Sequence, residues 1–479
     1  MINNRNLHKM NMQRQVLIAC LCLCFVGGCL VGPDYIPYEM EVSKNWSDTA
    51  KLHGGAEPNM AQWWAGFNDP TLTSLVERAM KSNLDLKQAR SRIRQARAAR
   101  WSAEGGFWPT VDVTGSQSRS RTSAGVKSNL YKTGLDASWE MDIFGGQRRD
   151  IEAANADVGA AVEDLRDVWV TLAAEIAVNY IELRGYQQEI VILQRNLATQ
   201  RKTAELTRTR FQGGFVGALD VANADALVAT TAAQLPLLES SVQQTIHNLG
   251  VLLGAEPSAL GGELNSISAV PSAPLRAPVG VPSELLRRRP DIRRAESQIH
   301  AATARIGVAT ADLFPKLTLS GSMSFQSQYA DRLVNWNKRI GSMGPSASWN
   351  IFDAGRVRAN IETRKSLQEQ SLLTYQSTVL TAMQEVEDAM VALAKEQEHY
   401  DALAKAVEFN RKAVELATTL YTQGETDFLN VLSAQRSVYS SEDALVSSRR
   451  TISTNLVALY KALGGGWEKT AVMEAPGVK

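Results

Sequence analysis

The second half of this 479-residue sequence repeats the first half. Residues 107–116 (FWPTVDVTGS) recur as residues 313–322 (LFPKLTLSGS), and the helical part of each half ends in Leu-Gly, at Gly254 and at Gly464. The offset between matching segments changes only from about 206 to about 210 residues, so nearly the whole chain is duplicated. This repeat is far longer than the unit of a solenoid. Each copy is predicted to contain a helix, a pair of strands, a long helix and a shorter helix, in that order.

The N-terminus has the pattern of a bacterial secretory signal. An apolar run at residues 16–28 follows a basic start, and it is too short to span a membrane as a permanent helix. The run ends in a sequence that resembles a lipobox, which predicts cleavage after Gly28 and a lipid on the Cys29 thiol. Leu30 follows instead of an aspartate, and this indicates the outer membrane as the destination. The other three cysteines are Cys20, Cys22 and Cys24. A metal or redox cluster is the alternative interpretation of their spacing.

Six segments are predicted along the chain. They are a signal peptide (1–28), a lipid-anchored extended segment (29–70), repeat one (71–254), a linker (255–282), repeat two (283–464) and a C-terminal tail (465–479). The linker is rich in proline, which predicts an extended connection. Trp63 and Trp64 precede the first helix and are predicted to make an apolar contact there, with surface recognition as the alternative.

Long helices are predicted in both copies because apolar residues recur at alternating steps of three and four, as in a coiled coil. The pattern runs through residues 147–211 in the first copy and through residues 372–421 in the second. At about 1.5 Å per residue, such a helix is roughly 100 Å long. Shorter helices are predicted at residues 71–104, 219–253, 283–312 and 428–463. Pro236 is expected to kink the second of these, and repeat two has no counterpart to it.

Polar and apolar residues alternate between the helices of each copy. Leu317 and Leu319 alternate with Thr318 and Ser320, and residues 135–143 follow the same pattern. Alternation over about ten residues is typical of a transmembrane strand, although a half-buried sheet of a soluble domain is the alternative. The strands are predicted as two pairs, joined by loops of about 15 and 20 residues. Four strands cannot close a barrel and an open edge cannot face lipid, so several chains are expected to share one barrel.

The chain resembles TolC-like outer membrane factors, and within them the lipoprotein branch that serves resistance-nodulation-division efflux pumps. The resemblance covers the whole mature chain. Its motifs are the lipobox, VGPDY at 31–35, the Trp pair with FNDP at 67–70, NLDL at 83–86, RRPDI at 288–292 and the paired strand–helix–Gly–helix units. The resemblance implies an α+β membrane protein, a homotrimer with four strands per chain. Its twelve-strand outer-membrane β-barrel is expected to continue as a periplasmic α-helical coiled-coil barrel about 100 Å long.

The function implied by the resemblance is passive conduction of small molecules through the exit duct of a tripartite efflux pump. The implied partners are a periplasmic adaptor (membrane fusion) protein, an inner-membrane pump and outer-membrane lipid. A duct for protein secretion or heavy-metal efflux is the alternative, and a lipoprotein coiled-coil scaffold is disfavoured by the strands. The net charge of +1 indicates no nucleic-acid partner. No catalytic residue, cofactor or metal is predicted, because the histidines lack ligand or triad spacing. The histidines considered are His53, His247, His300 and His399.

The resemblance also implies a gate where the long helices reverse direction at the periplasmic tip. In the family, repeat two carries a tyrosine, an arginine and two acidic residues there. The tyrosine matches Tyr421, but the arginine position reads Thr426 and the acidic positions read Asn430 and Ser433. Glu425 and Asp427 are candidates for substitute charge. The predicted tip residues are Gly214, Asp220, Tyr421, Gly424, Asp427 and Asn430. The alternative is that they are ordinary turn and cap residues.

Overall fold

The computed structural model of this chain describes residues 29–38, 40–43, 46, 60–121, 123, 125, 127–271, 284 and 287–468. The predicted signal peptide and most of the predicted tail therefore lie outside the described residues. The chain forms two compact units, and each unit draws on both sequence copies. The first holds the described residues within 1–39, 92–162 and 294–376, and the second holds those within 40–91, 163–293 and 377–479. Among the described residues, no helix is both long and apolar enough to cross a membrane.

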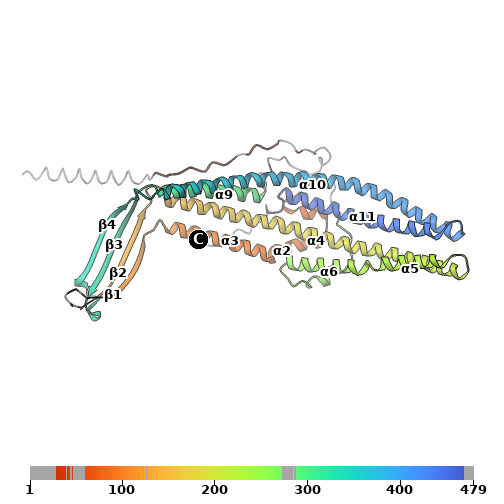
Figure 1. The fold of residues 1–479 in the computed structure, drawn as a ribbon, viewed down its shortest axis with the longest axis horizontal. Helices are drawn as coiled ribbons and strands as arrows, with labels where there is room; N and C mark the ends of the chain where they lie inside the picture. Colours follow the sequence, from red (N-terminus) through yellow and green to blue (C-terminus); the bar gives the residue numbers. More distant parts are fainter. Residues whose placement is uncertain are drawn as a thin grey trace, which may run out of the picture. The chain divides into compact units, whose positions relative to one another are not determined.

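The first unit contains an antiparallel sheet of four strands in the order β1-β2-β3-β4 (Figure 1). The strands are β1 (Thr110–Arg121), β2 (Lys127–Met141), β3 (Lys316–Ser327) and β4 (Arg339–Ser348). The two copies meet at β2 and β3, where Leu135 pairs with Met323 and Trp139 with Leu319. The expected loops of about 15 and 20 residues were wrong. The strands of both hairpins pair beyond the residues in which polar and apolar side chains alternate, so the connections are only residues 122–126 and 328–338. The second connection contains two 3-10 turns, η3 (Ala330–Arg332) and η4 (Trp336–Lys338).

The duplication also appears in single hydrogen bonds of the sheet. The indole Nε1 of Trp139 donates to the carbonyl oxygen of Phe107 at 2.8 Å, and that of Trp349 donates to the carbonyl oxygen of Leu313 at 3.0 Å. Each tryptophan therefore fastens the end of its hairpin to the residue that opens the same hairpin. An exposed indole with a hydrogen-bonded N–H is suited to a boundary between apolar and aqueous surroundings.

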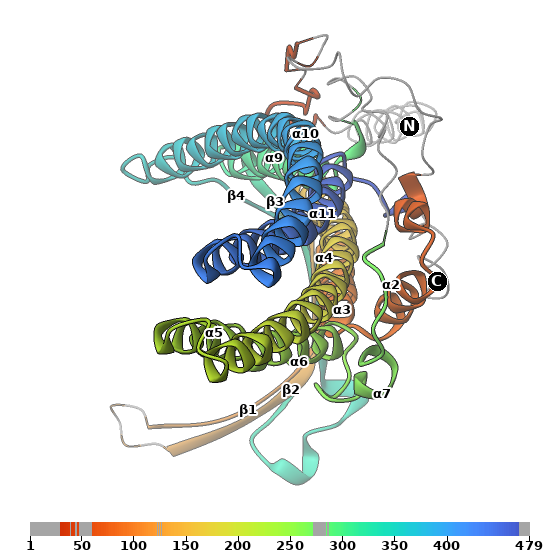
Figure 2. The same ribbon diagram turned by 90° about the vertical axis from the view of Figure 1, so that its right-hand side faces the viewer.

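Most of the described chain is helical. The helices are α2 (Pro70–Ser82), α3 (Leu84–Gly105), α4 (Gly146–Gln212), α5 (Ala218–Ala232), α6 (Leu235–Leu252), α7 (Gly261–Leu264), α9 (Pro290–Ala311), α10 (Arg356–Gln423) and α11 (Phe428–Ala462). The two long helices have 67 and 68 residues, as the coiled-coil pattern predicts. In the second unit α4 lies beside α5, and α10 lies beside α11 (Figures 1 and 2). Pro236 lies in the first turn of α6 and separates it from α5, whereas α11 is continuous, as expected.

Two of the expected short helices begin or break elsewhere. The helix expected at 71–104 is divided into α2 and α3 at Asn83. The helix expected at 283–312 is interrupted at Arg289, after which α9 begins, and residues 284, 287 and 288 before the break are helical. The cause is a contact made in both copies. The Asn83 amide donates to the carbonyl of Leu252 at 2.8 Å, and the Arg289 guanidinium donates to the carbonyl of Ala462 at 2.9 Å. These side chains cap the carboxyl ends of α6 and α11, whose last carbonyls have no partner within the helix.

The Trp pair lies in the core of the second unit. Trp63 and Trp64, in the 3-10 helix η2 (Met60–Phe67), are both buried, so the predicted apolar contact is confirmed. The Trp63 ring stacks on that of Tyr460, with centroids 5.3 Å apart. The indole of Trp169 donates to the carbonyl of Gly466 at 2.5 Å. The chain after α11 is thus held against α4, and α11 itself packs against the segment before α2. The linker is partly folded as well, since Leu260 and Leu264 at α7 are buried; its residues 272–282 lie outside the description.

Candidate functional site

The two long helices end in the same type of turn. α4 is followed by Gly213 and Gly214, and α10 is followed by Gly424. Gly214 and Gly424 have φ of +79° and +83°, a left-handed conformation that glycine adopts without strain. The N–H groups of Phe215 and Glu425 each reach back five residues to a helix carbonyl at 2.9 Å. This pattern is a Schellman motif, and it lets each long helix reverse into the shorter helix that follows.

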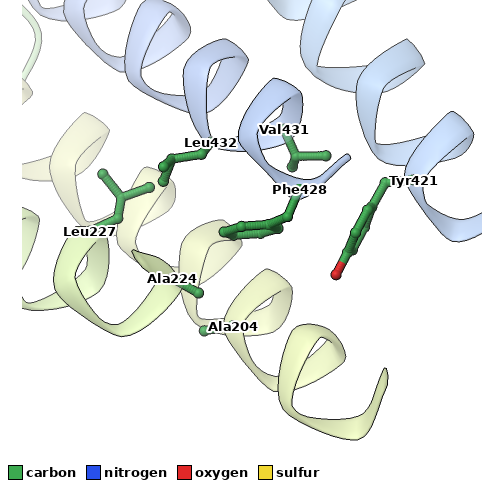
Figure 3. Packing of buried hydrophobic residues seen from close by; sticks show 7 residues of the cluster. All are labelled: Ala204, Ala224, Leu227, Tyr421, Phe428, Val431 and Leu432. Carbon is green, nitrogen blue, oxygen red and sulfur yellow. The ribbon is translucent and has the colours of Figure 1, made fainter. Parts of the chain in front are cut away.

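The reversed helices share one apolar core drawn from both copies. This group, here named the turn core, consists of Ala204, Ala224, Leu227, Tyr421, Phe428, Val431 and Leu432 (Figure 3). The rings of Tyr421 and Phe428 are 5.6 Å apart and tilted by 58°, and both side chains are buried. The Tyr421 hydroxyl donates to Thr207 Oγ1 at 3.4 Å, a long hydrogen bond. Apolar packing rather than hydrogen bonding therefore holds Tyr421.

Arg210, near the end of α4, connects the two turns. Its Nη1 donates to the carbonyl oxygens of Tyr421 at 2.7 Å and Thr422 at 3.1 Å. Its guanidinium also lies 4.7 Å from the centroid of the Tyr421 ring and 6.0 Å from that of Phe215. A cation at the carboxyl end of α10 interacts favourably with the helix dipole, and the ring face attracts it further. Arg210 thus caps the long helix of the other copy.

The structure brings together only some of the predicted tip residues. Tyr421 lies in the turn core, and the two glycines make the turns. Asp220 accepts the Gly217 N–H at 3.3 Å, which starts α5, and Asn430 donates to Thr426 Oγ1 at 2.7 Å. Asp427 is exposed at the start of α11 and makes no side-chain capping hydrogen bond. Its role as substitute charge at the tip stays a prediction.

Arg210 was not among the predicted residues. Its sequence signal is weak, because a basic residue in the last turn of a helix is common. The resemblance to the family implied an arginine in repeat two, at the position where Thr426 stands. The turn of repeat two instead receives its cation from repeat one, across 211 residues of sequence. Only the packing of α4 beside α10 makes that contact visible.

Two buried carboxylates, Glu442 on α11 and Glu189 on α4, lie in surroundings that shift their pKa values in opposite directions. Glu442 accepts from Asn196 at 2.9 Å and pairs with Arg195 at 2.6 Å and Arg411 at 2.7 Å. Burial alone would raise the pKa of Glu442, but these donors outweigh it and lower the pKa. Since Arg195 belongs to α4 and Arg411 to α10, Glu442 joins three helices.

Glu189 on α4 is buried with much weaker compensation. Burial raises its pKa to about 7, against the opposing effect of Arg450, which lies 3.0 Å away on α11. Asp443, also on α11, adds a second negative charge and has its own pKa raised by burial. The Arg450 guanidinium lies over the Tyr186 ring at 4.9 Å. Arg450 thus provides the opposing positive charge for both Glu189 and Asp443.

Two other kinds of site are a metal site and the predicted lipid attachment at Cys29. Within the described ranges, no three His, Cys, Asp or Glu side chains are grouped so that they could hold a metal ion. Cys29, the predicted lipid attachment point, is exposed and has a free thiol in the structure.

Comparison with known proteins places the fold. Residues 75–255 and 281–465 match the family model described as outer membrane efflux protein. The chain is 35% identical over 451 residues to nodulation protein T of Rhizobium leguminosarum bv. trifolii, covering 93% of this chain and 96% of that protein. It is 33% identical over 478 residues to the pyoverdine export outer membrane protein OpmQ of Pseudomonas aeruginosa, covering 96% and 98%.

Solved structures of outer-membrane channels agree. The channel OprN matches with a TM-score of 0.86 and 38% identity, over 92% of this chain and all of that chain. The open state of the Neisseria gonorrhoeae channel MtrE matches with a TM-score of 0.80 and 29% identity, over 92% of this chain and 99% of that chain. The fold is therefore that of one subunit of a TolC-like outer-membrane channel, not of an enzyme. The chain belongs to the outer membrane efflux protein family.

Proposed function

We propose that this protein is the exit duct of a tripartite efflux pump and conducts small molecules passively across the outer membrane. Three chains form the duct, and a periplasmic adaptor connects it to an inner-membrane pump of the resistance-nodulation-division type. The names of the relatives that export pyoverdine or toluene favour small organic substrates over folded proteins.

The open four-stranded sheet is the observation that carries this proposal. β1 and β4 lie at its two edges, and their backbone groups on the outer side lack partners within the sheet. Val111 and Val113 on β1, like Ile340 and Met343 on β4, are exposed. An edge with free N–H and C=O groups is costly in lipid, so the sheet requires neighbouring copies to close it. Three copies of four strands give a barrel wide enough to enclose a lumen.

A susceptibility assay tests the efflux role. Deletion of the gene should sensitise its host to compounds that the cognate pump expels, and the wild-type protein should restore resistance. Purified protein in a planar bilayer should also form channels without an energy source. Normal susceptibility of the deletion strain to dyes, solvents and antibiotics, together with no channel activity, would contradict the proposal.

The gate belongs to the same proposal. The tip residues Gly214, Asp220, Tyr421, Gly424, Asp427 and Asn430 shape the turns, and the contact between Arg210 and α10 holds the closed arrangement. The support is the burial of Tyr421 and the two carbonyls that accept from Arg210. Opening requires the adaptor to shift this contact.

The lipid anchor is the last part of the proposal. Cys29 carries diacylglycerol after removal of residues 1–28, as the lipobox predicts and its exposure permits. Mass spectrometry of the mature N-terminal peptide should show a lipidated Cys29. Membrane-extracted protein that keeps an unmodified residue 1–30 segment would contradict the anchor.

A further inference from the structure

The segment directly after Cys29 is bound to the first unit along its length. This segment, residues 30–38, is here named the N-terminal strap. The N–H of Val31 donates to the carbonyl of Phe144 at 3.2 Å, just beyond the end of β2. Further along, the hydroxyl of Tyr38 accepts from the Gln376 amide at 3.1 Å, and its ring meets that of Tyr375 edge-on at 6.0 Å. The strap thus contacts elements of both sequence copies.

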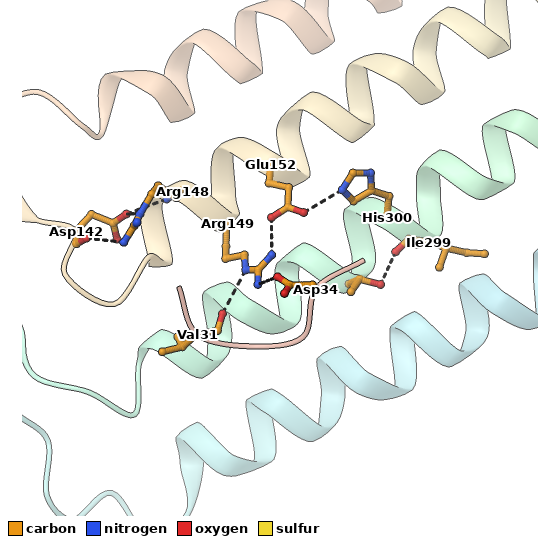
Figure 4. Close-up of polar contacts among 9 residues, drawn as sticks. Val31, Asp34, Asp142, Arg148, Arg149, Glu152, Ile299 and His300 are labelled. Carbon is orange, nitrogen blue, oxygen red and sulfur yellow. Dashed lines mark hydrogen bonds and ion pairs between the residues drawn. The ribbon is translucent and has the colours of Figure 1, made fainter. Parts of the chain in front are cut away.

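Arg149 on α4 is the centre of the contact (Figure 4). Its side chain is only 2% exposed, which makes an unpaired guanidinium costly. Its Nη2 donates to Asp34 at 2.6 Å, its Nε to the carbonyl of Val31 at 3.2 Å, and its Nη1 to Glu152 at 2.7 Å. Two of these three acceptors belong to the strap. Without the strap, Arg149 would keep Glu152 alone.

Aromatic and ionic contacts extend the binding site of the strap to α9. The ring of Tyr35 stacks on His300 with centroids 4.3 Å apart, and its hydroxyl donates to Glu296 at 3.3 Å. The His300 Nε2 lies 3.0 Å from Glu152, the same carboxylate that pairs with Arg149. Arg149, Glu152 and His300 thus form one chain of contacts from α4 to α9, covered by the strap.

Two glycines allow the strap to lie directly on α9. A Cβ on Gly32 would stand 2.4 Å from the Cα of Gly307, and Gly32 has a φ of +88°. A Cβ on Gly307 would stand 2.7 Å from the Arg149 side chain. Any larger residue at either position would displace the strap or its arginine. Such close fit on both sides indicates a binding seat rather than an incidental surface contact.

We propose that Arg149 is the positioning residue of the N-terminal strap, and that the seated strap fixes Cys29 beside the end of β2 while it joins α4 of repeat one to α9 and α10 of repeat two. The anchor half of this inference rests on the proposed lipidation of Cys29. Only Leu30 separates Cys29 from Val31, so their Cα atoms lie at most about 7 Å apart. The acyl chains therefore enter the bilayer where the strand ends, as a fixed attachment instead of a loose tether.

A spin label on the strap tests the seat in the full-length protein. Ile36 is exposed, and with Cys29 lipidated an Ile36→Cys substitution supplies the single free thiol of the mature chain. In detergent-solubilised protein the label should show slow, restricted motion. Asp34→Asn combined with Tyr35→Leu should increase the mobile fraction several-fold, and so should Arg149→Met. The double variant keeps the test valid if Arg149→Met fails to fold, because it changes only the strap.

The matched control is Asp157→Asn. It removes the ion pair with Arg305 between the same two helices, outside the strap, and should leave label motion unchanged. Cys29→Ser, combined with serine at Cys20, Cys22 and Cys24 so that an unprocessed leader adds no thiol, should remove the lipid and still leave the label restricted. Equal mobility in the wild type and the strap variants, or release of the strap by Cys29→Ser alone, would overturn the seat. An unlipidated Cys29 in mass spectra would overturn the anchor role. The motion of the spin label would still test the binding of the strap on its own.

Discussion

At the scale of single residues, a few charged side chains hold together segments that lie far apart in the sequence. Arg149 holds the strap, Arg210 caps α10, and Glu442 joins three helices. Each has at least one partner more than 100 residues away in sequence. A buried charge that loses a partner is strongly destabilising, so these residues are sensitive points for substitution.

Arg210→Met should weaken the closed state of the channel. The variant loses two hydrogen bonds from a charged donor, each contributing about 1.5 kcal/mol or more, and the change is repeated in every subunit. We expect longer or more frequent openings in single-channel recordings, by at least about tenfold. Arg208→Met is the matched control, because it removes only an exposed ion pair between α4 and Asp225 of α5 in the same repeat. Identical recordings from both variants would show that Arg210 is structural.

Glu189→Gln should flatten the dependence of stability on pH. The folded protein holds the Glu189 proton up to about pH 7, whereas the unfolded chain releases it near the ordinary value of 4.5. Between these values the folded state binds more protons, so the free energy of unfolding falls as pH rises. The wild type should therefore lose on the order of 1 kcal/mol more than the variant between pH 5 and pH 8.

Thermal unfolding of the solubilised protein at the two pH values measures this difference. Glu175→Gln, at an exposed position of the same helix, is the control and should behave as the wild type does. Asp443 keeps its own raised pKa, so some dependence on pH should remain in the Gln variant. A wild type as stable at pH 8 as at pH 5 would contradict the prediction.

At the scale of elements, the helix ends decide how each copy is laid out. A glycine with positive φ follows each of the helices α4, α6, α10 and α11. The side chains of Asn83 and Arg289 cap the carboxyl ends of α6 and α11. Pro236 divides one returning helix, while its counterpart in repeat two is continuous. The spacing of apolar residues predicts where the helices form, and these local breaks set their lengths.

Gly424→Ala should lower the melting temperature through backbone strain alone. A Cβ there meets nothing closer than the Arg210 side chain at 3.8 Å, so the cost comes from the φ of +83°. We expect a loss of about 1 kcal/mol per chain, and a smaller loss for Gly424→Asn, which tolerates this conformation better. Gly262→Ala, which also points into open space but has no positive φ, should be neutral. An unchanged melting temperature for Gly424→Ala would refute the cap.

At the scale of the whole molecule, the sheet determines the assembly. Its four strands are contributed equally by both copies and leave β1 and β4 at open edges. Pairing β4 of one chain with β1 of the next continues the antiparallel alternation, and three chains close the ring.

Native mass spectrometry in detergent should therefore report three copies of the mature chain. Proline at positions on the outer edges of β1 and β4 should reduce the trimer signal, because proline removes a ladder hydrogen bond. Proline at exposed loop residue Ser123 should leave the trimer intact. A folded monomer that stays dispersed without detergent would contradict both the barrel and the duct.

The sequence alone determined the features that depend on local period. Alternation of three and four specified α4 nearly to its ends and α10 from residue 372 onward, alternation of two specified parts of the strands, and Pro236 and Gly424 specified a break and a turn. These signals arise from neighbouring residues and need no partner. Of the tip residues named from the sequence, Gly214 and Gly424 form the turns, and the role of all six as a gate stays a prediction.

Only the tertiary structure decided which charges meet. Arg210 and Tyr421 lie 211 residues apart, and Arg149 and Asp34 lie 115 apart. Nothing in the period of either segment distinguishes these arginines from those that face solvent. The break at Asn83 and the proton held by Glu189 have the same origin. Each depends on burial against a second segment, and burial is a property of the packed copies rather than of the residues taken in order.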